Sequence, residues 1–369
     1  MGQGTLHGSG KRRGAALRAA LAFLVVGAGA CAAGCALRSV PTWPDAPSVE
    51  LQWPHRPAPA RIRWIKTIAS EHDAGIVRSF WQRALDLLAG TAGSRIVRPH
   101  GVLFDAHDRL FIADPGAGVV HCMDLGAGRY VQIGAEDGAR LQTPIGLTVD
   151  DRERLYITDS ATGTVYRYDL AARTLQPFLK SGLERPTGIV WSPTKGLLYV
   201  VDTLAHQVVA FDEYGAERFR IGGTGEGEAH FNHPTDICTD ARGQLYVTDA
   251  LNAKIKVLTP EGRFLRQFGI AGDAPGEFNK PKGVATDSEG HIYVSDALLD
   301  AIQIFDPEGR PLLTFGANGT GDGEFWMPSG LFIDRSDRIF VADTYNRRVQ
   351  VFRYLPAAPD AAPVDARPR

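Results

Sequence analysis

The sequence predicts an all-β protein, a β-propeller of six four-stranded antiparallel blades. A Pro-x-Gly motif followed by an apolar residue recurs at intervals of 42 to 48 residues. An apolar strand ends in aspartate fifteen or sixteen residues after each of these prolines. The 41 glycines and 23 prolines indicate many turns and short strands rather than long helices. Units of this length with four short strands each, repeated six times, are typical of propeller blades.

Six copies of the repeat are present. They open at Pro99, Pro144, Pro186, Pro234, Pro281 and Pro328, and their aspartates are Asp114, Asp159, Asp202, Asp249, Asp296 and Asp343. In the fourth copy, Asp236 replaces the glycine of the motif. Strand a follows the Pro-x-Gly and strand b ends at the aspartate. Strand c alternates, as in 255–258, and a Pro-Glu-Gly turn leads into strand d, 264–268.

The propeller is expected to span residues 61–354 and to be closed by its two ends. The sixth copy ends near Tyr354, after strand c, and lacks a strand d. Arg61–Ile68 has the character of strand d, so we expect this N-terminal strand to complete the last blade and leave few edges open. Between it and the first blade, apolar residues at helical spacing predict a helix over about 76–89, with Gly90 as its stop.

Residues 1–35 predict a lipoprotein signal peptide. Basic Lys11–Arg13 precede an apolar stretch, 15–30, and small residues then lead to Cys35. This arrangement resembles the bacterial lipobox, which implies acylation of Cys35 as the new N-terminus; Cys31 is a second candidate. The resemblance implies an exported lipoprotein, membrane-anchored in the cell envelope. Ala36 favours the outer membrane or its periplasmic side.

The segments that flank the propeller differ from it in composition. Residues 36–60 are rich in proline and predict a semi-extended tether, and residues 355–369 predict a disordered tail. The formal net charge is −2, and the four basic residues before Cys35 would be lost with the signal peptide. The remaining acidic chain lacks the electrostatic footprint of a nucleic-acid-binding protein. Nucleic acid is therefore excluded as a partner.

The repeats resemble NHL repeats, whose pattern continues after strand b as Asp-Thr-x-Asn-x-Arg and an alternating strand. The sixth copy keeps this pattern nearly whole over 343–352, the fourth keeps Asp249, Asn252 and Lys254, and the first three are degenerate. The resemblance covers roughly 97–354 and implies a TolB-like, six-bladed fold. It does not imply a function, because function depends on sites grafted on a fold.

Several repeated residues are interpreted as structural. Aspartate readily accepts hydrogen bonds from nearby backbone amides, so the six aspartates are expected to hold turns rather than a cation. Arg348 and Lys254 are expected to bond near the same turns. Phenylalanines recur at one position of the linkers and predict blade-to-blade packing; they are Phe231, Phe278 and Phe325.

Candidate binding residues lie in loops of one face. Chain order places the d–a and b–c loops together, and the variable residue of Pro-x-Gly marks the mouth of the central channel. Loops on a rigid scaffold commonly carry recognition, although each residue is as readily explained as a solvated loop. The predicted ligand-binding face comprises His100, Thr187, Thr235, Lys282 and Ser329 at the mouth and His206, Asn252, Asp300, Tyr345 and Arg347 around it.

The sequence favours a non-catalytic binding or scaffolding protein with a protein, peptide or glycan ligand, and predicts no cofactor or metal. The alternative is a metal-dependent lyase or hydrolase at the channel mouth. His100 resembles a metal-ligand position of the NHL-type peptidyl-α-hydroxyglycine amidating lyases. Calcium-dependent lactonases and streptogramin lyases have a similar fold, so the fold alone leaves these activities open. A catalytic zinc normally needs three protein ligands, and no second histidine occurs at this position of the repeat. His230 and His233 share a linker and form the other candidate pair.

Overall fold

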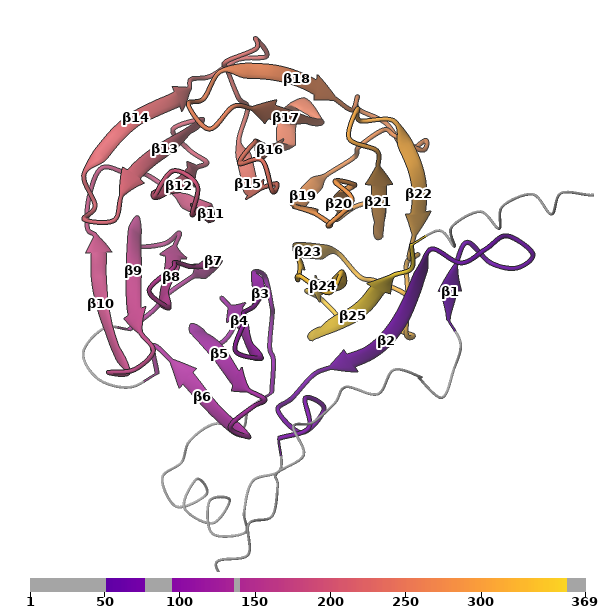
Figure 1. Ribbon diagram of the computed structural model, residues 1–369, viewed down its shortest axis with the longest axis horizontal. Helices are drawn as coiled ribbons and strands as arrows, with labels where there is room; N and C mark the ends of the chain where they lie inside the picture. Colours follow the sequence, from indigo (N-terminus) through magenta and orange to yellow (C-terminus); the bar gives the residue numbers. More distant parts are fainter. Residues whose placement is uncertain (1–50, 77–94, 136–139, 357–369) are drawn as a thin grey trace, which may run out of the picture. The chain divides into compact units, whose positions relative to one another are not determined.

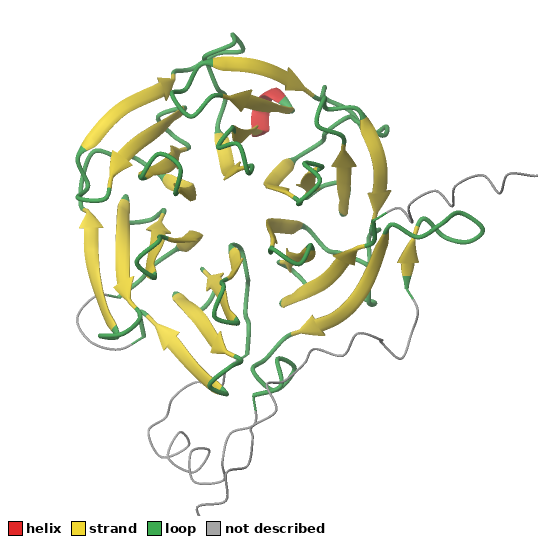
Figure 2. Ribbon diagram, viewed as in Figure 1, coloured by secondary structure: helices red, strands yellow, loops and turns green. Residues whose placement is uncertain are grey.

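The computed structural model describes residues 51–76, 95–135 and 140–356, all within one compact unit, Pro41–Arg369. Six antiparallel sheets surround a central channel, which confirms the predicted propeller (Figure 1). In the described part, the sole helical element is the 3-10 turn η1 (Ala250–Asn252) (Figure 2). None of the helical segments described is long and apolar enough to cross a bilayer. The signal peptide, the helix expected after Ile76 and the tail after Pro356 lie outside the described residues.

Each blade follows the predicted order, with strand a at the channel and strand d outermost. Blades one to three are β3 (Val102–Phe104), β4 (Arg109–Asp114), β5 (Val119–Asp124) and β6 (Arg129–Ile133); β7 (Pro144–Val149), β8 (Arg154–Asp159), β9 (Thr164–Asp169) and β10 (Thr174–Leu179); β11 (Pro186–Ser192), β12 (Leu197–Asp202), β13 (Gln207–Asp212) and β14 (Glu217–Gly222). Blades four to six are β15 (Pro234–Thr239), β16 (Leu245–Asp249), β17 (Lys254–Leu258) and β18 (Phe264–Phe268); β19 (Pro281–Thr286), β20 (Ile292–Asp296), β21 (Ala301–Phe305) and β22 (Pro311–Phe315); β23 (Pro328–Ile333), β24 (Arg338–Asp343) and β25 (Arg348–Tyr354), completed by β2 (Ile62–Ile68) and β1 (Gln52–Trp53).

Burial differs between the middle strands and the outer strand of each blade. Every residue of β20 and of β21 is buried, because the neighbouring blades cover both faces of these strands. In β22, only the last residue is buried and most of the others face solvent. The hydrophobic core therefore lies between blades, where each sheet packs face to face on the next.

The linker phenylalanines belong to this core. Phe231, Phe278 and Phe325 are all fully buried. Phe278 packs with Phe305 of its own blade in a cluster that also contains Tyr246 of blade four. The predicted blade-to-blade packing is confirmed.

The glycine of Pro-x-Gly is required by close approach, because neighbouring strands a converge at the channel. A Cβ atom on Gly330 would collide with the carbonyl oxygen of His100, and the Gly330 amide donates to that oxygen at 2.9 Å. In blade four the motif holds Asp236 instead. Its Cα and Oδ1 abut Gly188 of blade three, and its Oδ2 accepts a hydrogen bond of 3.1 Å from the Val284 amide of blade five.

The two ends of the described chain close the ring together. β2 pairs antiparallel with β25, from Ile62 opposite Tyr354 to Ile68 opposite Val349, so the predicted N-terminal strand of the last blade is confirmed. Figure 1 shows β2 lying along β25, outside it. Thr67 also donates a hydrogen bond of 2.8 Å to Asp322.

One strand appears where the sequence indicated a tether. β1 pairs with β2 and makes the last blade five-stranded. The ring of Trp53 lies 5.8 Å from that of Phe315 and 5.9 Å from that of Phe352, measured between centroids. The described part of the range 36–60 is thus attached to blade six, because an aromatic side chain finds a buried partner there.

Candidate functional site

A channel of about 1050 Å³ runs through the ring and is lined by the six strands a. One end is bordered by d–a and b–c loops, including His100, Thr187 and Leu251; we call it the d–a mouth. The other end, the a–b mouth, is bordered by a–b loops such as those of Asp105 and Asp334. The predicted grouping of loops on two faces therefore matches the structure.

Hydroxyl groups join the b–c loops to the d–a mouth. Thr203, directly after the strand b aspartate, donates to the carbonyl oxygen of Pro234 at 2.7 Å, and Thr344 donates to that of Pro99 at 2.9 Å. Each bond reaches the Pro-x-Gly of the next blade. The Asp-Thr pair of the repeat thus connects successive blades beside the channel.

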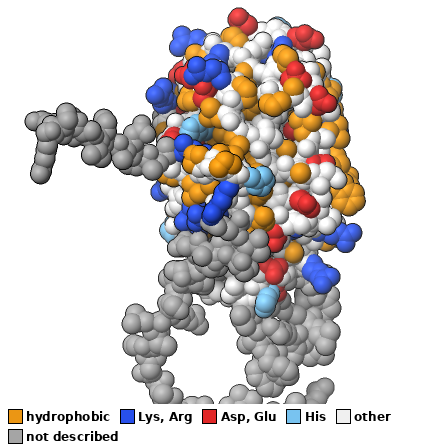
Figure 3. Space-filling view, turned by 90° about the vertical axis from the view of Figure 1, so that its right-hand side faces the viewer, with side chains coloured by type: hydrophobic (Ala, Val, Ile, Leu, Met, Phe, Trp, Pro, Cys, Tyr) orange, Lys and Arg blue, Asp and Glu red, His pale blue; other side chains and the backbone are white. Residues whose placement is uncertain are grey.

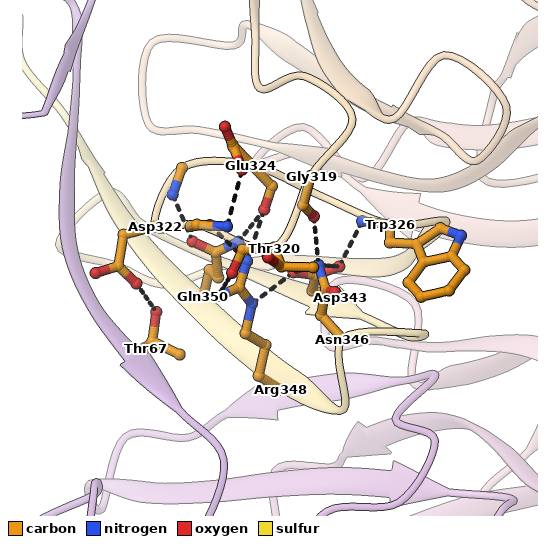
Figure 4. A network of polar contacts seen from close by, with 12 residues as sticks. Thr67, Gly319, Thr320, Asp322, Glu324, Trp326, Asp343, Asn346, Arg348 and Gln350 are labelled. Atoms are coloured by element: carbon orange, nitrogen blue, oxygen red, sulfur yellow. Dashed lines mark hydrogen bonds and ion pairs between the residues drawn. The ribbon is translucent and has the colours of Figure 1, made fainter.

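The strand b aspartates hold the d–a linkers of their own blades, as Figure 4 shows for Asp343. Asp343 accepts a hydrogen bond of 2.8 Å from the Trp326 amide and one of 2.7 Å from Arg348 Nε. Asp296 likewise accepts bonds from the Asn279 and Lys280 amides. Their expected bonding to backbone amides is confirmed, although the main partners lie sixteen to eighteen residues earlier in the chain.

The second basic residue expected at these turns is a different one. Arg348 reaches the carbonyl oxygens of Thr320 and Gly321, as expected. In blade four the buried cation is Lys256 rather than Lys254. Its Nζ lies 3.4 Å from Asp249 and donates to the Gly227 carbonyl at 2.6 Å. Lys256 is inaccessible because both faces of its strand are covered, and it occupies the position that Gln303 and Gln350 hold in blades five and six.

The d–a mouth carries positive charge that no described carboxylate neutralises by ion pairing. Lys282 lies in the wall, and neither it nor the nearby Lys280 and Arg185 has a described carboxylate oxygen within 4.0 Å. Burial, followed by the charges of Lys280 and Arg185, lowers the pKa of Lys282, and only Asp296 acts in the opposite direction. A cluster of cations at a concave opening attracts anionic groups.

His100 is a neutral side chain within this cluster. Burial and the charges of Lys282 and Arg98 lower the pKa of His100 to about 3. An imidazole with that pKa is a poor general base at neutral pH, because efficient proton transfer needs a pKa near the working pH. It can still donate or accept a hydrogen bond to a bound molecule.

Deeper in the wall lie Asp236 and Cys238, which were not among the predicted site residues. Burial raises the pKa of Asp236 to about 7. Burial and the charges of Asp236 and Asp240 raise the pKa of the Cys238 thiol, so the thiol stays protonated and is a weak nucleophile. The signal for Asp236 was present in the sequence, since it is the one residue that breaks the glycine pattern.

Most of the predicted site residues form hydrogen bonds within the fold, and among them Thr187 Oγ1 lies 2.8 Å from Thr203 Oγ1 and Thr235 donates to the Lys282 carbonyl at 3.0 Å. The hydroxyl of Ser329 lies 2.7 Å from that of Thr344. Asn252 donates to the Gly225 carbonyl at 2.9 Å, and Asp300 accepts from the Met327 amide at 2.6 Å. Their repeat positions therefore have a structural explanation.

Several predicted residues line or border the channel. Thr187 and Thr235 line the channel, while Tyr345 and Arg347 are exposed around its mouth. The ring of His206 lies 4.4 Å from that of His233, and its Nδ1 accepts the His233 amide proton at 3.1 Å. The structure thus pairs His233 with His206 of the neighbouring loop.

The residues at the d–a mouth do not fit a catalytic metal. The positions equivalent to His100 are Ile145, Thr187, Thr235, Lys282 and Ser329, and the charge of Lys282 acts directly on His100. Across residues 51–76, 95–135 and 140–356, no three His, Cys, Asp or Glu side chains converge as a metal site would require. A divalent cation placed beside Lys282 would be repelled, so we derive no metal-assisted step.

Fold and channel together define a six-bladed β-propeller with NHL-type repeats. The NHL repeat family model matches residues 325–352, and the model described as SMP-30/Gluconolactonase/LRE-like region matches residues 159–278. Comparison with curated proteins finds no match.

Solved structures share the architecture. Virginiamycin B lyase from Staphylococcus aureus is 16% identical with a TM-score of 0.52, covering 71% of this chain and 96% of its own. A gluconolactonase from Xanthomonas campestris is 17% identical with a TM-score of 0.55, covering 70% and 86%. An auxiliary nutrient binding protein from Bacteroides thetaiotaomicron is 16% identical with a TM-score of 0.57, covering 70% and 69%. Identities this low show the fold alone, and these relatives include both enzymes and a binding protein.

Proposed function

We propose that this protein is a non-catalytic binding protein of the cell envelope that holds a protein, peptide or glycan ligand at its d–a mouth through an anionic group of the ligand. The observation that carries the proposal is the cluster of Lys282, Lys280 and Arg185 without ion-pair partners among the described residues. Like charges that repel one another are stabilised when an anion binds between them.

The chemistry of the mouth supports binding over catalysis. His100 is a weak base, and the Cys238 thiol is protonated. No described nucleophile is hydrogen-bonded to a general base at the mouth, an arrangement that covalent catalysis requires. A structural neighbour that is named as a nutrient binding protein shows that this architecture serves binding elsewhere.

Cross-linking in envelope membranes tests the proposal. The full chain, expressed in a Gram-negative host, should become cross-linked to its ligand, and salt added before the cross-linker should reduce the yield of that product, since screening weakens exposed charge pairs. Lys282→Gln combined with Arg185→Gln should lose that ligand. Lys195→Gln, which removes an exposed lysine paired with Glu261 at 2.7 Å, is the matched control and should retain it. Equal retention by all three proteins would refute the proposal.

Anchoring at Cys35 is a separate part of the proposal and has its own test. Labelled palmitate should be incorporated into the full chain and not into Cys35→Ala. Incorporation that persists in Cys35→Ala and disappears in Cys31→Ala would move the anchor to Cys31, and no incorporation in the parent chain would exclude a lipid anchor.

The second candidate is a metal-dependent lyase or hydrolase, favoured by the match to the gluconolactonase-like region and by the lyase and lactonase neighbours. Metal analysis of the purified chain separates the two. Stoichiometric zinc or calcium that is lost in His100→Ala would support the enzyme. Metal below stoichiometric amounts in both proteins is the result that the binding proposal expects.

A further inference from the structure

Apolar side chains recur at one exposed position of the d–a/b–c face. The residue two places after the strand b aspartate is Leu204, Leu251, Leu298 and Tyr345 in blades three to six, with exposed fractions of 44%, 60%, 52% and 42%. Blades one and two hold Gly116 and Ala161 there. We call the four residues the apolar arc. Single exposed leucines are ordinary, but a row at one repeat position on adjacent blades marks an interaction surface.

The arc continues onto the linkers. The Tyr345 amide donates to the Trp326 carbonyl at 3.2 Å, and the two rings lie 5.5 Å apart. Trp326 is 47% exposed, and the guanidinium of Arg98 lies 5.3 Å from the centre of the Tyr345 ring. An apolar rim with an aromatic end and a cation beside it provides anchoring of the kind found at the energetic centres of interfaces.

The arc meets the cationic cluster at one of its four members. Leu251 itself lines the channel together with Lys280, Lys282 and Arg185. A ligand seated here meets leucine side chains on one side and ammonium or guanidinium groups on the other. This complementarity fits a peptide segment that carries a carboxylate beside apolar side chains.

Other anionic ligands fit less well. Sugars and nucleobases present flat faces and hydroxyl or ring polar groups, which bind to aromatic platforms and hydrogen-bonding side chains. Three of the four arc residues are leucines, and an aliphatic side chain offers no ring face and no hydrogen-bonding group. Aliphatic rows bury aliphatic or aromatic side chains of a polypeptide instead.

We propose that the apolar arc and the cationic mouth together bind an acidic, apolar peptide segment of a partner protein. This inference rests on the proposed function, because the carboxylate of the peptide is held by the same lysines. It adds the class of ligand and the four residues that select it.

Fluorescence anisotropy with labelled probes and the full chain in mild detergent tests it. The probes are eight-residue peptides of three compositions, Leu/Phe with Asp/Glu, Ser/Gly with Asp/Glu, and Leu/Phe with Lys, together with a hexuronate oligosaccharide and a single-stranded oligonucleotide. Only the acidic, apolar peptides should bind saturably. Leu251→Ser with Leu298→Ser should weaken that binding about tenfold or more, since each substitution removes apolar area from the contact.

Leu265→Ser with Leu312→Ser is the matched control. These leucines lie on strands d of the same two blades, are 42% and 54% exposed, and are remote from the channel lining. The control should bind like the parent, and circular dichroism should show both double variants folded, because none of the four side chains is buried.

The outcomes separate the two levels of the proposal. If the hexuronate, the oligonucleotide or the polar acidic peptide binds in a Lys282-dependent manner while the arc variant binds like the parent, the peptide inference is wrong and the anionic-ligand proposal stands. If no anionic probe binds, or if Lys282→Gln leaves all binding unchanged, the proposed function fails as well.

Discussion

The two mouths of the channel are built from the same repeat but differ in how their charged side chains are paired. At the a–b mouth, the aspartates that close the a–b turns of blades one, two and six have an arginine partner four residues later, and Asp105, Asp150 and Asp334 each lie 2.6 Å from theirs. At the d–a mouth Lys280, Lys282 and Arg185 have no such partner among the described residues. Figure 3 shows the outer side between the two faces, where basic, acidic and hydrophobic side chains are interspersed.

This difference indicates where the molecule is stabilised and where it is free to bind. Paired acids at the a–b mouth close their own turns, as when Asp334 accepts the amides of Ser336 and Arg338. Their charges are already compensated. Unpaired cations at the d–a mouth form no ion pairs that stabilise the fold, so they are available to pair with the anionic group of a ligand. The following substitutions test this contrast, from the largest expected effect to the smallest.

Asp343→Ala should destabilise the protein most. Asp343 is fully buried and is paired with Arg348, and loss of one partner of a buried pair costs about 3–5 kcal/mol. Chemical unfolding measures the change. Asp322→Ala, which removes an exposed carboxylate bonded to Thr67, is the control and should cost about 1 kcal/mol or less. Equal losses would contradict the structural role of the strand b aspartate.

Asp236→Asn should change the pH dependence of stability. The pKa of Asp236 is about 7 in the fold and 3.8 ordinarily, so the folded protein holds the extra proton between these values. The stability that this proton gives to the folded state is fully present below about pH 4 and is lost as the pH rises through 7. The free energy of unfolding then falls by at most ~1.4 kcal/mol per pH unit.

The comparison with the parent isolates this group. The lowered pKa of His100 acts in the opposite direction between about pH 3 and 6.5 and is present in both proteins. The free energy of unfolding of Asp236→Asn relative to the parent should therefore rise with pH across this window. A constant difference would show that the Asp236 carboxyl titrates at its ordinary pKa.

Asp334→Ala should have an intermediate effect. The substitution removes two amide hydrogen bonds and the pair with Arg338 at the a–b mouth, where solvent is close, and about 1–2 kcal/mol is expected. Thermal unfolding checks the loss of stability. Ligand binding at the d–a mouth should be unaffected, and a weakened affinity would show that the two mouths are coupled.

Lys282→Gln should change stability least. Because no described carboxylate pairs with Lys282 and its cationic neighbours repel it, the free energy of unfolding should stay within about 0.5 kcal/mol of the parent. The same variant should lose the anionic ligand. A large loss of stability would instead indicate that the lysine holds the fold together.

The sequence predicted the fold well because the repeat combines several independent signals. The spacing of prolines and aspartates defines four strands per blade, and the missing strand d after Tyr354 indicates closure by Arg61–Ile68. β1 was not predicted, because two residues in a proline-rich stretch carry no periodicity. Trp53 packs on Phe315 of blade five and Phe352 of blade six through tertiary contacts that local sequence does not encode.

The site was harder to predict for a physical reason. Chain order places loops on the correct face, but it does not tell which polar side chains bond within the fold. Ser329, Asn252 and Asp300 form hydrogen bonds with atoms distant in sequence. The alternation of strand c marks Lys256 as polar but does not show that it is buried against Asp249, and Asp236 lines the channel in place of a glycine. Each depends on contacts between blades.

The pairing of β2 with β25 has a consequence for biogenesis. β2 is synthesised before any blade, yet its hydrogen-bonding partner is the last of the described strands to be made. Blade six cannot assemble until translation has passed Tyr354, so the ring closes only after the other five blades have been synthesised. A nascent chain that is halted before this point leaves β2 without its partner, and protection of its amides from hydrogen exchange would report the moment of completion.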